Sequence, residues 1–71
     1  MRKELIFMKK NFIAMGDYYE SKTYGLVRTI ARAIDVYTKD SVIIFTEVGS
    51  GGIAGDILSM KESDFKIEIG E

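Results

Sequence analysis

The sequence predicts one small domain of mainly β structure. Its 71 residues are enough for a single domain, expected to span 1–71, and the absence of proline and of low-complexity stretches leaves no sign of a linker. The eight residues SVIIFTEV at Ser41–Val48 are largely β-branched or aromatic and have turn residues on both sides, which is typical of a strand. Two further segments, 53–60 and 65–69, also have strand patterns.

The N-terminal part contains two short apolar segments. Residues 3–8 and 12–15 could pair as strands across the KKN sequence between them, and a short helix is the other interpretation. The apolar run LIFM is shorter than a signal-peptide core of about 7 to 15 residues. No stretch approaches the roughly 20 apolar residues of a membrane span, so we expect a cytoplasmic protein.

The segment 26–37, LVRTIARAIDVY, allows two interpretations. Its apolar residues recur at helical spacing, which gives the alternative fold class, an α+β protein with a helix at 26–37 packed on an antiparallel sheet. However, the segment holds several β-branched residues, among them Val27, Thr29, Ile30 and Ile34, and Tyr24-Gly25 before it is a poor helix N-cap. The turn residues 37–40 join it closely enough to the next strand for a hairpin.

The three C-terminal segments each predict a strand. The nearly continuous apolar run at 41–48 predicts that both faces of this strand are covered, either inside a barrel or under a partner chain. Residues 53–60, IAGDILSM, form a strand interrupted at Gly55, where we expect a bulge or a sharp bend. Residues 65–69, FKIEI, alternate as a half-buried strand does.

A family resemblance favours the strand interpretation of 26–37. The matching positions begin with G-D-Y-Y at residues 16–19 and continue through Tyr24, Val27, Ile30, Ala31, Arg32, Val42 to Phe45, Gly52 and Phe65. Over about fifty residues, 16–65, this pattern resembles a family of small phage and bacterial SH3-like barrels. The aromatic residue that usually follows the glycine of the short strand is absent here.

The resemblance implies a five-stranded SH3-like barrel over residues 16–71, with 24–34 as a twisted strand. Residues 1–15 then become an N-terminal extension strand. Because an added apolar strand offers open backbone hydrogen-bonding groups, the extension is expected to form a subunit contact.

Composition indicates self-association. A chain of this size buries only about 60% of its unfolded surface, and such domains are usually stabilised by disulfides, metals or oligomerisation. The chain has no cysteine and no histidine, which excludes disulfides, zinc and haem ligation and the Cys-His and Ser-His catalytic arrangements. A homo-oligomer is therefore expected, with no catalytic residue, no metal site and no cofactor.

Charge and glycine patterns suggest an anion site. Residues 1–32 carry seven basic and three acidic side chains, net +4, whereas residues 33–71 carry three basic and eight acidic ones, net −5. Arg28 and Arg32, four apart, would share a face on a strand or a helix and could bind phosphates bidentately. The run Gly49-Ser50-Gly51-Gly52 is first of all a hairpin turn that needs positive φ. Its Ser50, Gly51 and Gly52 could in addition form an anion-binding nest.

Aromatic residues complete the expected site. Tyr18 and Tyr19 could stack on a nucleotide base, although such tyrosines more often fill a rim or an interface. We expect a non-catalytic homo-oligomer that holds a small anionic ligand at subunit boundaries, most of all a nucleotide or cyclic nucleotide. Phage proteins that sequester cyclic-nucleotide immune signals are similar in size, barrel character and oligomeric habit, which suggests a phage anti-defence protein in the host cytoplasm.

Two other functions stay open. One is an SH3-like protein- or nucleic-acid-interaction module, such as a phage inhibitor or an accessory subunit that docks by a sheet edge. A net charge of −1 disfavours a duplex nucleic-acid binder, which should be basic overall. The other is a purely structural oligomer, in which the arginines and tyrosines are interface residues.

Overall fold

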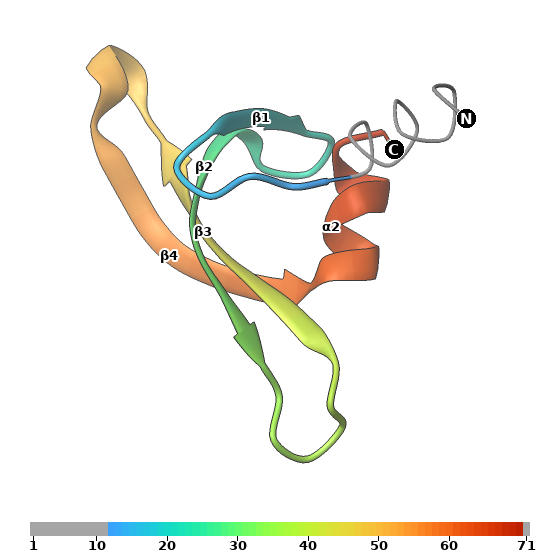
Figure 1. Ribbon diagram of the computed structural model, residues 1–71. Coiled ribbons are helices and arrows are strands. Elements are labelled where there is room, and N and C mark those ends of the chain that lie inside the picture. Colours follow the sequence, from blue (N-terminus) through green and yellow to red (C-terminus); the bar gives the residue numbers. More distant parts are fainter. Residues whose placement is uncertain (1–11, 71) are drawn as a thin grey trace.

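The computed structural model describes residues 12–70, which form four strands and one short helix (Figure 1). The elements are β1 (Tyr18–Ser21), β2 (Gly25–Ile34), β3 (Ser41–Val48), the 3₁₀ turn η1 (Ser50–Gly52), β4 (Ala54–Lys61) and α2 (Glu62–Glu68). The strands make one antiparallel sheet in the order β1-β2-β3-β4. The mainly β class is confirmed, but in residues 12–70 the sheet is open and four-stranded rather than a closed five-stranded barrel.

The predicted N-terminal extension is described only in part. Residues 3–8, expected to pair with 12–15, lie outside the described residues. Residues 12–15 form no strand of their own and instead bond to β2 through side chains. The Thr29 Oγ1–H donates to the Ala14 carbonyl at 2.6 Å, and Arg32 Nη2 donates to the Ile13 carbonyl at 2.8 Å. This segment therefore belongs to the domain.

The contested segment 26–37 is a strand over most of its length, so the helix alternative is wrong. β2 pairs with β1 along one side and with β3 along the other. Its register against β3 shifts between Thr29 and Ala31, which makes Ile30 the extra residue of a β-bulge. The bulge breaks the two-residue alternation halfway along β2. Among the apolar residues of β2 only Val27 is buried, so their helical spacing does not mark one buried face.

The hairpin predicted at residues 37–40 is confirmed. Asp35 closes it, since its Oδ1 accepts the backbone N–H groups of Tyr37 at 2.8 Å and Thr38 at 3.1 Å. These bonds, led by the one from Thr38, lower the pKa of the Asp35 carboxyl. An aspartate that accepts backbone N–H groups two and three residues ahead is a common device for reversing a chain.

The predicted irregularity of the next strand is also confirmed. Between the pairs Thr46↔Ile57 and Val48↔Ala54, β4 has one residue more than β3, at the position of Gly55. A Cβ on this glycine would lie 3.2 Å from the Cβ of Glu47. The glycine is needed because the two backbones approach closely where the strand bends.

The segment 65–69, expected to be a strand, is helical from Glu62 to Glu68, so that prediction is wrong. Acidic residues in the first turn of α2 and Lys66 in its last turn suit the helix dipole. The helix buries Phe65, whereas Ile67 stays 61% exposed. In a strand both side chains would face the core, but only the helix directs Phe65 alone into it.

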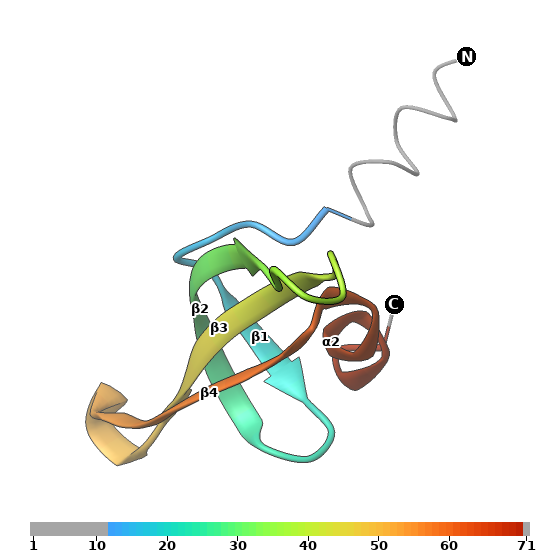
Figure 2. The same cartoon turned by 90° about the horizontal axis from the view of Figure 1, so that it is seen from below.

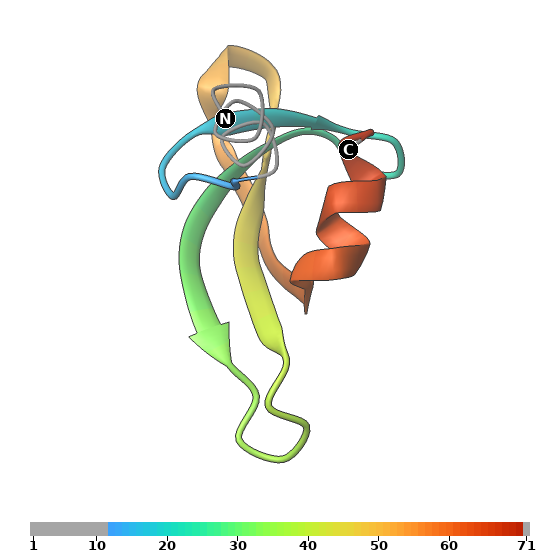
Figure 3. The same ribbon diagram turned by 45° about the vertical axis from the view of Figure 1, so that its right-hand side comes forward.

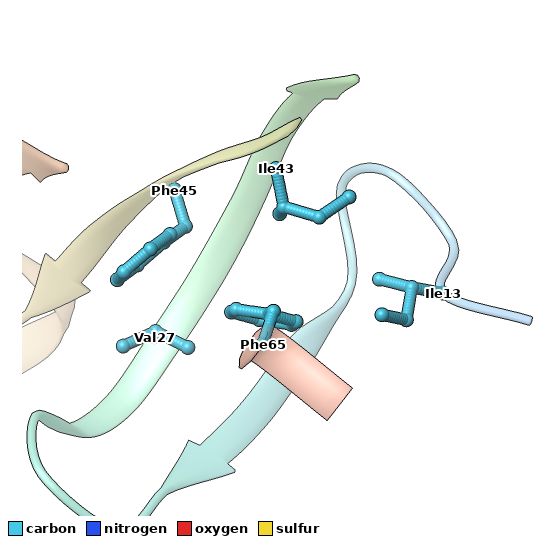
Figure 4. Packing of buried hydrophobic residues seen from close by; sticks show 5 residues of the cluster. All are labelled: Ile13, Val27, Ile43, Phe45 and Phe65. Atoms are coloured by element: carbon cyan, nitrogen blue, oxygen red, sulfur yellow. The ribbon is translucent and has the colours of Figure 1, made fainter. Parts of the chain in front are cut away.

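The core lies between α2 and one face of the sheet. Among residues 12–70 five apolar side chains are fully buried: Ile13, Val27, Ile43, Phe45 and Phe65. Figure 4 shows them converging from the segment before β1, from β2, from β3 and from the helix. The rings of Phe45 and Phe65 lie 5.2 Å apart between centroids. This small cluster is the interior of the domain.

The two faces of the sheet differ in their cover. Figures 2 and 3 show α2 lying on one side of the sheet, which we call the inner face, and the opposite side is the outer face. On β3 the inner residues Ile43 and Phe45 are buried, whereas on the outer face Val42 and Ile44 are half-buried and Thr46 is buried. Within residues 12–70 the outer face of β3 is thus only partly covered, and its cover by a partner chain stays a prediction. The helix α2, as the longest helix there, is too short to cross a membrane.

Candidate ligand-binding site

The sheet register separates the two arginines that were expected to act together. Arg28 pairs with Thr46 across β2 and β3, and Arg32 pairs with Ile43. Cross-strand partners share a face, and Thr46 and Ile43 are three apart in a regular stretch of β3. The side chains of Thr46 and Ile43 therefore point to opposite faces of the sheet, and so do those of the arginines paired with them. Arg28 belongs to the outer face and Arg32 to the inner one, because the bulge at Ile30 adds one residue between them.

Arg28 lies in a row of four side chains that crosses the outer face. Each pairs with the next from β1 to β4: Tyr18, Arg28, Thr46 and Ile57. The guanidinium carbon of Arg28 is 5.5 Å from the centre of the Tyr18 ring, within the range of a cation–π contact. The ring both holds the guanidinium in place and presents an exposed aromatic surface beside it, since Tyr18 is 57% exposed.

A shallow pocket of about 370 Å³ opens beside this pair. It is lined by Gly16, Arg28, Thr29, Ile30 and Thr46. Within residues 12–70 Arg28 makes a single hydrogen bond, from Nε to the Gly16 carbonyl at 3.2 Å, and no salt bridge. The N–H groups on its two terminal nitrogens have no hydrogen-bond partner within these residues. A guanidinium in this state offers the fork of donors that can bind phosphate or carboxylate.

Arg32 is already occupied. Its Nη2 lies 3.0 Å from Glu62 Oε2 and its Nε donates to Oε1 at 3.1 Å, a bidentate pair. The Ser41 hydroxyl donates to the same carboxylate at 2.7 Å. The hydrogen bond from Arg32 is the main cause that lowers the pKa of Glu62, and the same bond raises the pKa of Arg32. This network ties the start of α2 to β2 and β3.

The two predicted tyrosines also separate. Tyr19 follows Tyr18 directly in β1, so it points to the inner face. Its ring meets Phe65 edge-on at 5.9 Å, and its hydroxyl oxygen accepts the Ala14 N–H at 3.0 Å. Tyr19 therefore packs the core and positions the segment before β1, while Tyr18 keeps an exposed ring.

The glycine run forms the turn between β3 and β4, as predicted. Gly51 and Gly52 have φ of +73° and +79°, values that residues with a side chain rarely adopt. The Gly49 N–H donates to the Ile53 carbonyl and the Gly52 N–H to the Gly49 carbonyl, so one amide of the expected nest, that of Gly52, is engaged within the turn. Ser50 lies four residues beyond Thr46, roughly 13 Å along the strand from the row of Arg28.

Four pocket residues were missed by the sequence reasoning. Beside Arg28 the pocket is lined by Gly16, Thr29, Ile30 and Thr46. Thr29 and Thr46 are buried polar residues, and both hydroxyls bond to backbone carbonyls, which makes them structural. The presence of threonines within largely apolar strands was a signal in the sequence for these two residues. The sequence does not show that they lie near Arg28, because the register between β2 and β3 depends on the bulge.

A second pocket, of about 330 Å³, lies where α2 begins. It is lined by Asp40, Ser41, Lys61, Glu62, Ser63 and Lys66. Its two lysines and two carboxylates sum to no net charge, and Lys61 contacts Asp40 at 3.6 Å. The residues that the structure describes contain no group of three or more side chains suited to a metal ion.

Comparisons with protein-family models, with curated proteins and with solved structures give no match.

Proposed function

We propose that the protein is a non-catalytic, self-associating binding protein that holds a small anionic ligand through Arg28 and Tyr18. The observation that carries the proposal is that Arg28 both lines a pocket and has its guanidinium over the exposed ring of Tyr18, with most of its donors unused within residues 12–70. An anion beside an aromatic surface fits a nucleotide, whose phosphate would meet Arg28 and whose base would stack on Tyr18.

The site we propose is smaller than the sequence suggested. Arg32 is left out because Glu62 neutralises it, and Tyr19 because its ring is part of the core packing. Ser50, Gly51 and Gly52 lie at the end of the β3–β4 hairpin and could reach only a ligand that extends along the outer face. A mononucleotide is thus a better fit to the Arg28 pocket than a ligand with widely separated phosphates.

We also propose that the fold is a variant of the SH3-like barrel in which α2 takes the place of the closing strand. Phe65, at the position of the aromatic residue that closes the resembling pattern, is buried against Phe45 and Tyr19. The long bulged β2 and its hairpin with β3 also suit such a barrel. The phage origin, the anti-defence role and the location in a host cytoplasm stay predictions from the resemblance.

Ligand titration with site variants tests the function. Isothermal titration against mononucleotides, cyclic nucleotides and inorganic phosphate should reveal binding by at least one of them. Arg28→Gln should weaken that binding roughly 10- to 100-fold, since a hydrogen-bonded charge pair contributes about 1.5–3 kcal/mol. Tyr18→Leu should weaken nucleotides but not phosphate. Lys22→Gln, which removes an exposed cation outside the pocket, is the matched control and should bind as the natural chain does.

Failure of the whole panel would favour the interaction module instead. Around Arg28 the outer face exposes Tyr18, Leu26 and Ile30, and tyrosine and arginine with apolar neighbours are the usual anchors of protein interfaces. In that case Arg28→Gln would leave small anions unaffected and would abolish capture of a protein partner. Equal binding of a nucleotide by Arg28→Gln and by the natural chain would overturn the proposed site.

A further inference from the structure

The sheet formed by the described residues has two edges, and they are protected unequally. β1, at one edge, has only four residues, and Glu20 lies among them. Short length and charge are the usual means by which an edge strand avoids pairing with another chain. β4, at the other edge, has eight residues and is mostly exposed. Its two charges, Asp56 and Lys61, lie toward its ends.

The middle of β4 presents backbone and apolar side chains without protection. Ile57, Leu58 and Ser59 carry no charge, and Ile57 is 70% exposed on the outer face. The register shift at Gly55 bends one end of the strand, but from Ile57 to Lys61 the pairing with β3 is regular. A regular, uncharged edge of this kind is a template for a further strand, because one side of its backbone has no partner strand among residues 12–70.

The charges along β4 identify a second copy as the strand that fits. Asp56 lies near the beginning of β4 and Lys61 at its end, where the Lys61 side chain is 59% exposed. In antiparallel pairing with an identical strand about an axis at Leu58, Asp56 of each copy lies opposite Met60 of the other, one residue from its Lys61. The acidic end of each strand thus runs beside the basic end of the other. A two-fold axis near Ile57 or Leu58 avoids like charges, whereas an axis at Ser59 would set Asp56 opposite Glu62 of the copy.

We propose that two copies of the protein pair through their β4 strands, antiparallel and about a two-fold axis, into one continuous eight-stranded sheet. The proposal rests on the self-association in the proposed function but not on its ligand. The pairing places Ile57 of each copy at the centre of the joined outer face. It also lets the second copy cover more of Leu58 and Met60, which are half-buried on the inner face. Arg28 lies two strands from the joined edge, roughly 10 Å, so each copy keeps its own pocket.

Sedimentation equilibrium of the full chain tests the pairing. We expect a mass of twice 8.0 kDa at micromolar concentration for the natural chain. Ile57→Lys should reduce it to that of one chain, because a lysine at the centre of the edge meets the lysine of the copy and blocks pairing. Val36→Lys is the matched control: Val36 is 70% exposed, as Ile57 is, but lies in the hairpin between β2 and β3, so this variant should remain a dimer.

Amide hydrogen exchange keeps the test decisive if the substitution disturbs folding. β4 amides should exchange at least 10-fold faster in Ile57→Lys than in the natural chain, while those of β2 keep their protection. Ser59→Lys, at another exposed position of the same edge, should have the same effect on mass and exchange. A natural chain that sediments as a monomer, or one that stays a dimer with Ile57→Lys, would overturn the pairing. Titration of the monomeric variant with the panel then tests Arg28 separately.

Discussion

At the scale of single residues, the contacts of each arginine decide its role. Arg32 and Arg28 are the same residue type in one strand, but Arg32 donates to Glu62 and to the Ile13 carbonyl, while the terminal nitrogens of Arg28 make no hydrogen bond within the described residues. The bidentate pair of Arg32 with Glu62 has no net charge with which to attract an anion. Removing Arg32 should therefore affect stability, and removing Arg28 should affect binding.

The Arg32–Glu62 pair predicts an acid-sensitive stability. Because Arg32 lowers the pKa of Glu62 in the folded state, its contribution is present above the unfolded pKa of about 4.5 and is lost as the pH falls through the lower folded value. Glu62→Gln should therefore lower the free energy of unfolding by about 1 kcal/mol at pH 7 and flatten its decline below pH ~4.5. Urea unfolding followed by circular dichroism from pH 7 to 3 measures both effects.

Asp64→Asn is the control for this prediction. Asp64 lies in the same first turn of α2 as Glu62, but its carboxylate makes no salt bridge within residues 12–70. The pH profile of Asp64→Asn should remain parallel to that of the natural chain. If Glu62→Gln and Asp64→Asn had the same pH profile, the loss of stability at low pH would come from general charge repulsion and not from the Arg32–Glu62 pair.

At the scale of elements, the β3–β4 turn depends on backbone conformation more than on side chains. Gly51 has φ of +73°, and no atom lies within 4 Å of where its Cβ would be. A substitution there would thus cost only the energy of the left-handed conformation, about 1–2 kcal/mol. Gly51→Val should lower the unfolding free energy by that amount or somewhat more, whereas Gly51→Asn should cost less, because asparagine tolerates this region.

Gly49→Ala is the matched control within the same turn, because Gly49 has φ of −84°. It should change stability by less than about 0.5 kcal/mol, and chemical denaturation of the three variants gives the comparison. Ligand titration of Gly51→Val separates the two roles of the turn. Lost stability with unchanged affinity supports a turn alone, and a drop in affinity at full stability would instead make the loop part of the anion site.

At the scale of the whole molecule, one helix closes a small core. Phe65 is the one buried residue of α2, and it contacts both Phe45 and Tyr19. The ends of the helix are held by carboxylates, Glu62 to Arg32 and Glu68 to the Ser21 and Thr23 hydroxyls. The hydrogen bond from Ser21 is the main cause that lowers the pKa of Glu68. The helix thus depends on one apolar side chain between two polar attachments.

Phe65→Ala should come close to unfolding the protein. Truncating a buried phenylalanine costs about 3–5 kcal/mol, which is most of the roughly 4–10 kcal/mol expected for a chain of this length. Guanidinium unfolding should therefore show a shortened or lost folded baseline. Ile67→Ala, in the same helix but 61% exposed, should change stability by less than about 0.5 kcal/mol. A large effect of Ile67→Ala would indicate that this face of α2 is covered in solution.

The sequence by itself determined those elements whose pattern is local. The strand at 41–48, the hairpin turn at 37–40, the glycine turn and the irregularity at Gly55 were all predicted and are present. Each follows from side-chain branching or from the backbone freedom of glycine, which act over a few residues. The single domain of mainly β structure follows from the same patterns.

Only the tertiary structure decided where the site residues point. The bulge at Ile30 reverses the facing of every later residue in β2, so Arg28 and Arg32 lie on opposite faces although their spacing predicts the same one. Similarly, the alternation at 65–69 is typical of a strand, but in the structure these residues belong largely to a helix that packs Phe65 against the inner face. Both outcomes depend on partners distant in sequence, because a strand gains its hydrogen bonds and a core its contacts from other parts of the chain.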